Sequence, residues 1–177
     1  LMAAGLVWRS AQSIVTPYVV EVDHGGQVRA VGEAATPYPP NDAQIAHHLA
    51  NFIEYVRALS IDPVVVRANW LGAYGFVTDR GAATLNEHAR AQDPFADLGR
   101  RSRSVEIVSV VRVSEDSFQA RWIEKSFNNG ALMKTERFTG LFTLVIQPPR
   151  DAATLRANPL GLYIHQLHWS QDLVTGD

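Results

Sequence analysis

The spacing of apolar residues changes between the two halves of the chain, and this change restricts the possible folds most. In the second half, from Ser104 onward, apolar side chains alternate with polar ones, as they do in strands with one buried face. Helices followed by antiparallel strands predict one α+β domain over residues 16–177, with helices packed on the concave face of a curved antiparallel sheet. In the first half the spacing is helical. One continuous apolar stripe of a predicted helix is formed by Ile45, Leu49, Phe52, Ile53, Val56 and Leu59.

Capping residues mark where the predicted helices begin. Asn41 or Asp42 can cap the first helix, and Gln44 stands three residues after Asn41, as in a capping box. Asp62-Pro63 is typical of an N-cap followed by a first-turn proline, so a second helix is expected to begin there. The other elements expected in this half are a hairpin of two strands over 18–23 and 27–32 and a third helix over 82–91.

Three long strands are expected in the second half, and their alternation predicts which side chains face inward. Asn129-Gly130 is a strong turn signal between the second and the third strand. We expect the helices and the sheet to meet at Ile45, Phe52, Trp70, Trp122 and Phe142, in the core of a cone-shaped roll. The residues assigned to one face of their strands are Val105, Ile107, Val111 and Val113 in the first, Phe118, Ala120 and Trp122 in the second, and Phe138, Gly140, Phe142, Leu144 and Ile146 in the third.

The tetrapeptide Asn158-Pro159-Leu160-Gly161 separates a short helical pattern over 151–157 from the last run of the chain, 162–173. Pro159 fixes its own φ and disfavours helical angles at Asn158, so the helix must end there. Gly161 permits a turn conformation or a close backbone approach that a side chain would resist. The motif is therefore interpreted as a hinge that aims the last strand.

Charge and composition argue against several classes of function. A formal net charge of −2 and a pI near 6.3 give no broad basic face, so direct nucleic-acid binding is not expected. The one basic cluster, Arg100-Arg101-Arg103, is interpreted as a solvated segment before a strand. The absence of cysteine excludes a disulfide framework, a thiolate zinc site and a cysteine nucleophile. No nucleotide-binding or hydrolase motif occurs in the sequence, so no cofactor is expected.

The histidines and carboxylates do not form a recognisable catalytic or metal-binding pattern. His47 and His48 are adjacent on a helix and are interpreted as surface residues, whereas His165 and His168 are predicted to face opposite sides of a strand. Most strand carboxylates are expected to face water; this group comprises Glu21, Asp23, Glu106 and Glu124. A lyase or isomerase pocket is kept as an alternative function by fold analogy, and its candidate residues are Tyr18, Tyr74, Asp23 and His165.

Two segments leave alternatives open. By strand alternation, Tyr163, Leu167 and Trp169 share one face of the last strand, and that face is either core, which is favoured, or a partner surface. The apolar segment 1–8, which is followed by Arg9, is either a first amphipathic helix or the last turns of a transmembrane helix that begins upstream.

Both ends of the chain resemble the bitopic inner-membrane assembly-factor family of type IV secretion systems. Residues 16–23, with the sequence TPYVVEVD, are similar to the family's first strand after its membrane helix. Asn158-Pro159-Leu160-Gly161 and the segment 162–170 are similar to its Asn-Pro-x-Gly signature and last strand. The order of helices and strands between these segments also agrees.

The resemblance implies a periplasmic domain with a nuclear-transport-factor-two-like fold, no catalysis, and contacts with itself and with other secretion subunits. It also implies that 1–15 is the remnant of a transmembrane or membrane-proximal helix, which anchors the domain in the bacterial inner membrane. The structural and assembly role of the signature carries over to Asn158, Pro159 and Gly161, and Leu160 occupies its variable position. Residues 78–103 match no motif of the family.

Overall fold

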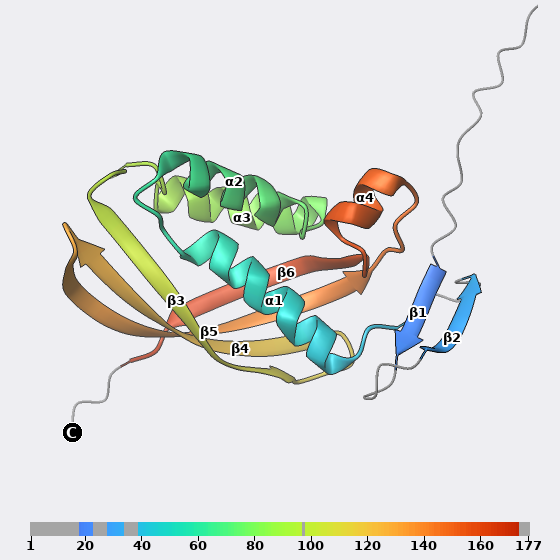
Figure 1. Ribbon diagram of the computed structural model, residues 1–177. Coiled ribbons are helices and arrows are strands. Elements are labelled where there is room, and N and C mark those ends of the chain that lie inside the picture. Colours follow the sequence, from blue (N-terminus) through green and yellow to red (C-terminus); the bar gives the residue numbers. More distant parts are fainter. Residues whose placement is uncertain (1–17, 23–27, 34–38, 97, 174–177) are drawn as a thin grey trace, which may run out of the picture.

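The computed structural model describes residues 18–22, 28–33, 39–96 and 98–173. The described part confirms the predicted α+β class, because α1, α2 and α3 lie over one face of a curved antiparallel sheet (Figure 1). In chain order the elements are β1 (Tyr18–Val22), β2 (Val28–Glu33), α1 (Asp42–Arg57), α2 (Pro63–Tyr74), α3 (Asp79–Ala91), β3 (Arg101–Arg112), β4 (Ser117–Asn128), β5 (Ala131–Ile146), α4 (Ala152–Ala157) and β6 (Leu162–Gln171).

The strands form two sheets. The predicted hairpin is confirmed for the described residues, since β1 pairs antiparallel with β2 in a separate two-stranded sheet. The larger sheet has the order β3-β4-β5-β6, in which each strand pairs antiparallel with its neighbour. Within the described ranges, no helix has both the length and the apolar content that a bilayer crossing requires.

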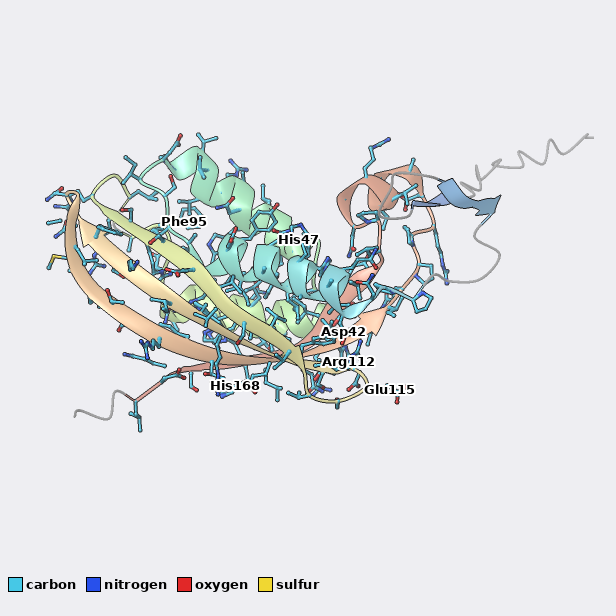
Figure 2. All side chains as sticks on the ribbon, turned by 60° about the horizontal axis from the view of Figure 1, so that its bottom comes forward. Asp42, His47, Phe95, Arg112, Glu115 and His168 are labelled. Atoms are coloured by element: carbon cyan, nitrogen blue, oxygen red, sulfur yellow. The ribbon has the colours of Figure 1, made fainter. Side chains whose placement is uncertain are left out.

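The predicted capping box begins α1. The side chain of Asn41 accepts a hydrogen bond from the backbone of Gln44 at 2.9 Å, and the side chain of Gln44 accepts one from the backbone of Asn41 at 2.9 Å. At the same end, the guanidinium of Arg112 lies 2.8 Å from Asp42, which ties the helix to the end of β3 (Figure 2). The apolar stripe of α1 is buried against the sheet, and its core members are Ile45, Leu49, Phe52, Ile53 and Val56.

The interpretation of His48 as a surface residue is wrong. Only 7% of its surface is exposed, and its ring centroid lies 4.3 Å from that of Phe76. Its Nε2 atom has no hydrogen-bond partner among the described residues. The prediction for His47, which is exposed, is confirmed. Helical spacing places adjacent residues about 100° apart, so one of them can join the buried face while the other stays in water.

The helices α2 and α3 follow their capping signals. Asp62 caps α2 and Pro63 occupies its first turn, as predicted. The third helix begins three residues earlier than predicted, because Thr78 caps it through a hydrogen bond that its side chain accepts from Gly81. Gly81 also lies against the carbonyl oxygen of Ile164, where a Cβ atom would collide. The glycine therefore allows α3 to pack closely on β6.

The core forms where the inward rows of the sheet meet α1, as predicted. Phe118 pairs with Phe142 and Trp122 pairs with Phe138, with the ring centroids of the second pair 5.7 Å apart. The ring of Phe52 meets Phe142 edge-on at 6.2 Å. The core is closed by the partly buried Trp70, which packs against the buried cluster.

Two β-bulges change the predicted faces of the sheet. Between Ile107 and Ser109 the pairing of β3 with β4 shifts by one residue, so Val110 turns inward. Val111 and Val113 were assigned to the same face as Ile107, but they are 50% and 51% exposed. A bulge inserts a residue that the partner strand does not match, which reverses the alternation beyond it. The second bulge lies in β6.

Candidate functional site

The Asn158-Pro159-Leu160-Gly161 turn joins α4 to β6, as the sequence predicts. Asn158 is 2% exposed, and its side chain bonds both backbone groups of Leu162. Its Nδ2 atom donates to the carbonyl oxygen of Leu162 at 2.7 Å, and its Oδ1 atom accepts from the amide of Leu162 at 3.2 Å. Asn158 therefore fixes the direction in which β6 leaves the turn.

Gly161 has both backbone properties predicted for it. Its φ is 59°, in the left-handed region, and a Cβ atom would collide with the carbonyl oxygen of Gln147. The amide of Gln147 donates to the carbonyl of Gly161 at 2.7 Å, so the turn is bonded to the end of β5. Pro159 is exposed on the outside of the turn. The part of this turn in assembly stays a prediction.

The prediction that Tyr163, Leu167 and Trp169 share one face is wrong. Thr143 pairs with Gln166 and Leu144 pairs with Ile164, so His165 is unmatched and forms the second bulge. Leu167 and Trp169 are core residues with 6% and 9% exposure, whereas Tyr163 lies on the other face of β6. For Leu167 and Trp169, the favoured core alternative is therefore correct, and a role of these residues in partner contact stays a prediction.

The residues of the alternative enzyme pocket do not converge where the structure describes them. Atom Nδ1 of His165 lies 3.1 Å from Oγ1 of Thr78, while the hydroxyl of Tyr74 donates to Asn86. Asp23 and the side chain of Tyr18 lie outside the described residues.

His165 and His168 are not brought together, as predicted. His168 lies on the side of the sheet that faces away from the helices (Figure 2). Among the residues that the structure describes, no three side chains of the metal-ligating types lie close enough to hold an ion.

The main polar site of the core centres on Glu124, which was expected to face water and is fully buried. The guanidinium of Arg57 donates two hydrogen bonds to it, from Nε to Oε1 at 2.6 Å and from Nη2 to Oε2 at 3.0 Å. The indole Nε1 of Trp122 donates to Oε1 at 2.8 Å. Such a two-pronged, charge-assisted pair is the strongest arrangement available to arginine and a carboxylate.

Arg103 brings a second positive charge to the same carboxylate. Its Nε atom lies 3.4 Å from Oε2 of Glu124 and donates to the backbone carbonyl of Arg57 at 2.5 Å. Its side chain is 25% exposed and it lies within β3, so its interpretation as part of a solvated segment before the strand is wrong. Burial lowers the pKa of the Arg103 guanidinium from its usual value, and the negative charge of Glu124 opposes this shift.

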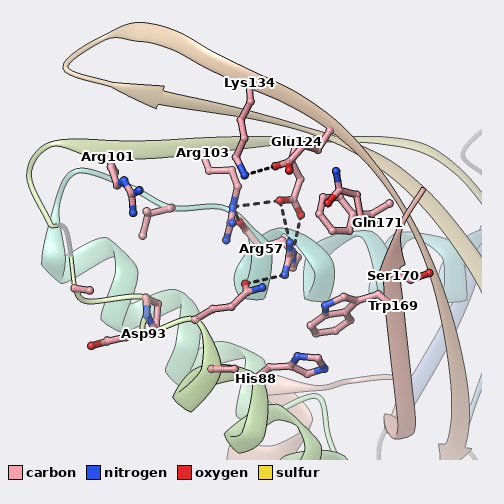
Figure 3. A pocket seen from close by; sticks show the side chains of 17 residues that line it. Arg57, His88, Asp93, Arg101, Arg103, Glu124, Lys134, Trp169, Ser170 and Gln171 are labelled. Atoms are coloured by element: carbon pink, nitrogen blue, oxygen red, sulfur yellow. Dashed lines mark hydrogen bonds and ion pairs between the residues drawn. The ribbon is translucent and has the colours of Figure 1, made fainter. Parts of the chain in front are cut away.

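A cavity of about 770 Å³ opens above this charged group (Figure 3). Two rings flank the guanidinium of Arg57, since Phe138 lies 4.7 Å and Trp169 lies 5.5 Å from its carbon. The ring of His88 stacks on Trp169 at 4.2 Å. Burial and then the charge of Arg57 lower the pKa of His88, which favours its neutral form. The cavity thus combines charged and aromatic walls.

This arrangement suits binding and mechanical support better than proton transfer. Every nitrogen of the Arg57 side chain is bonded, because Nη1 donates to Gln92 at 3.2 Å. Glu124 is held as an acceptor by two arginines and an indole, so it is not placed to remove a proton from a substrate. The cluster joins the end of α1 to β3 and β4.

One feature of the sequence does indicate that Glu124 is buried. It continues the inward row of Phe118, Ala120 and Trp122, so the strand alternation places it in the core. A buried carboxylate then requires a cation or several donors. The sequence does not indicate which arginine supplies the charge, because Arg57 stands 67 residues away.

Known proteins share both the sequence pattern and the fold. The profile of the VirB8 protein family matches residues 1–172. The conjugal transfer protein TrbF of Rhizobium radiobacter is 28% identical over 170 residues, which cover 94% of this chain and 77% of TrbF.

Two solved structures illustrate the fold. The VirB8 protein of Agrobacterium tumefaciens superposes with a TM-score of 0.64 at 13% identity, covering 80% of this chain and all of that one. A TrwG component of a type IV secretion system from Bartonella birtlesii gives 0.62 at 14% identity, covering 74% and 92%. These neighbours confirm the nuclear-transport-factor-two-like fold expected from the sequence. Because the family profile extends over nearly the whole chain, this protein belongs to the VirB8 family.

Proposed function

We propose that this chain is a non-catalytic structural component of a type IV secretion system that transfers DNA by conjugation. The observation that carries this proposal is the family match over residues 1–172, together with the relation to TrbF along most of the chain. The polar groups of the core support it, because Glu124, Arg57 and Asn158 are bonded to their own fold.

The proposed location is the bacterial inner membrane, crossed once, with residues 16–177 as a domain in the periplasm. Residues 1–15 then form the end of the anchoring helix. Periplasmic fragments of TraM and DotI have a similar fold, with TM-scores of 0.50 and 0.52, which agrees with this placement. A reporter enzyme that is active only in the periplasm, fused after residue 177, tests the topology. Activity confined to a cytoplasmic reporter would contradict it.

The proposed partners are further copies of this chain and other subunits of the secretion channel. Direct contact with nucleic acid is not part of the proposal, since the net charge is −2. A membrane anchor confines the copies to two dimensions, so a weak contact between domains becomes effective in the cell. Sedimentation of the chain over a concentration series measures this contact, and a strict monomer at the highest concentration argues against it.

Conjugation itself provides the test of the function. A donor strain that carries the cognate transfer system is deleted for this gene, and the frequency of plasmid transfer is measured with and without the restored gene. We expect transfer to fall by at least a hundredfold on deletion and to recover on complementation. Normal transfer by the deleted donor would overturn the proposal.

A further inference from the structure

Arg103 uses only part of its hydrogen-bonding capacity. Its Nε atom donates to the carbonyl of Arg57 and contacts Glu124. Among the described residues, neither of its terminal nitrogens, Nη1 and Nη2, makes a hydrogen bond. Figure 3 shows this end of the side chain directed into the cavity. Four N–H donors of a fixed, planar group therefore face open space.

Two carboxylates, Glu124 and Glu136, act on the positive charge of Arg103, but each of them is also paired with another cation. The single carboxylate of Glu124 is already bonded twice by Arg57 and once by Trp122. Glu136 forms an ion pair with Lys134 at 2.8 Å. Arg57, Arg103 and Lys134 therefore share the two carboxylates of Glu124 and Glu136. Burial already disfavours the charged form of Arg103, so a further anion would relieve an electrostatic deficit.

The other walls indicate what carries that anion. Trp169, Phe138 and Leu59 give the cavity apolar surface beside the arginine. A volume of about 770 Å³ is larger than one carboxylate needs, and it accommodates a side chain with part of its backbone. The planar donors of Arg103 match the two oxygens of a carboxylate. An acidic side chain flanked by small or apolar residues fits both features.

We propose that Arg103 and this cavity receive a glutamate or aspartate side chain from an extended segment of a partner polypeptide. The inference rests on the proposed function, because it assigns one contact between this chain and its secretion partners. Bidentate pairing with Arg103 supplies the specificity, and contact with Trp169 and Phe138 supplies apolar burial. The pairing weakens as the salt concentration rises, since part of it is electrostatic.

A titration followed by NMR tests the site. The full chain, labelled with ¹⁵N, is titrated with the peptide acetyl-Gly-Leu-Glu-Leu-Gly-amide and, in parallel, with its Gln counterpart. We expect saturable shifts of the Trp169 indole and the Arg103 side-chain signals with the Glu peptide, and at least tenfold weaker binding of the Gln peptide. Equal binding of the two peptides, or no shift at these signals, would overturn the proposal.

Variants separate this site from general electrostatics. Arg103→Gln should weaken binding of the Glu peptide at least tenfold, and Arg103→Lys, which keeps the charge without the fork, should weaken it less. Arg121→Gln removes an exposed arginine on the outer face of the sheet and should leave binding unchanged. The melting curve of each variant is recorded, and Arg103→Lys remains the test if Arg103→Gln does not fold.

Two further outcomes distinguish the hypotheses. If acetate or free glutamate alone binds as tightly as the Glu peptide, the cavity is a site for small anions and the assignment to a polypeptide is wrong. If no anion binds while plasmid transfer still depends on this gene, the inference fails and the proposed function stands. In that case Arg103 serves only to join β3 to the end of α1.

Discussion

The two ends of β6 are constructed in different ways. At its first residue the strand is held by Asn158 and Gly161, which act on the backbone within four positions of Leu162. Near its last residue, Trp169 lies beside a charged cluster whose members, Arg57 and Glu124, are 67 residues apart. The first end is therefore specified by local sequence, and the second exists only when the whole fold has formed.

A substitution in the turn at the first end of β6 gives the largest expected loss of stability. Gly161→Val places a β-branched residue in the left-handed region and drives its Cβ atom against Gln147, so we expect a loss of about 4 kcal/mol in the free energy of unfolding. Urea unfolding measures it. Gly130→Val is the matched control, because Gly130 also has positive φ but no atom of the described residues lies within 4 Å of its Cβ position. Equal losses in the two variants would mean that the close approach to Gln147 costs nothing.

A substitution in the charged cluster near the last end of β6 gives the next largest expected loss of stability. Glu124→Gln keeps the shape of the side chain but removes the buried carboxylate that pairs with Arg57 and Arg103, and we expect a loss of about 3 kcal/mol. The control Glu106→Gln removes an exposed carboxylate that lies 3.6 Å from Lys125 and should cost less than about 0.5 kcal/mol. A neutral result for Glu124→Gln would show that the cluster does not hold the fold together.

Asn158→Ala tests the local end without backbone strain. The change leaves the amide and the carbonyl of Leu162 buried without their side-chain partner, which should cost about 2 kcal/mol. Asn51→Ala is a suitable control, since the side chain of Asn51 bonds to the exposed side chain of His47. Thermal unfolding compares the two variants. A smaller loss for Asn158→Ala than for Asn51→Ala would contradict the role assigned to the turn.

Lowering the pH gives the smallest expected effect on the free energy of unfolding. It acts through His48, which lies near the turn at Leu162. Burial lowers the pKa of His48 to about 4, and a hydrogen bond with the backbone of Leu162 opposes this shift. The unfolded chain therefore binds this proton first, and stability is lost as the pH falls from the ordinary value of 6.5 toward 4. Between pH 7.5 and 5.5 we expect a loss of about 1 kcal/mol from this residue.

Unfolding at several pH values measures the effect of acid. His48→Phe should flatten the curve between pH 7.5 and 5.5, whereas His47→Gln, at an exposed position, should leave it unchanged. If His48→Phe keeps the full pH dependence, another group is responsible.

The sequence predicted those features that depend on near neighbours. The cap at Asn41, the proline at the start of α2 and the turn at Gly161 each need only the backbone properties of a few residues. The core rows of β4 and β5 also follow from simple alternation, except at Ile146, the last residue of β5, which was assigned to the inward row but is 48% exposed. The expected fold and family were correct for the same reason, because they rest on the order of such segments and on a short signature.

The failures have two physical causes. A bulge can be introduced by a single residue without any change in composition, so the reversed faces beyond Val108 and His165 were not visible in the sequence. The charged cavity could not be predicted from the sequence for another reason. Arg57 closes a helix and Arg103 opens a strand, positions at which arginine ordinarily faces water, and only the fold brings both to Glu124.

The bulge at Val108, the residue left unmatched between Ile107 and Ser109, also affects how readily the edge of the sheet can pair with another strand. It lies on β3, an outer strand of the larger sheet, whose pairing with β4 shifts at that point. A straight, regular edge strand can form hydrogen bonds with the same strand of another molecule, and repeated pairing of this kind leads to aggregation. The local kink spoils the register that such growth requires. The irregular strand is therefore a poor template for edge-to-edge pairing.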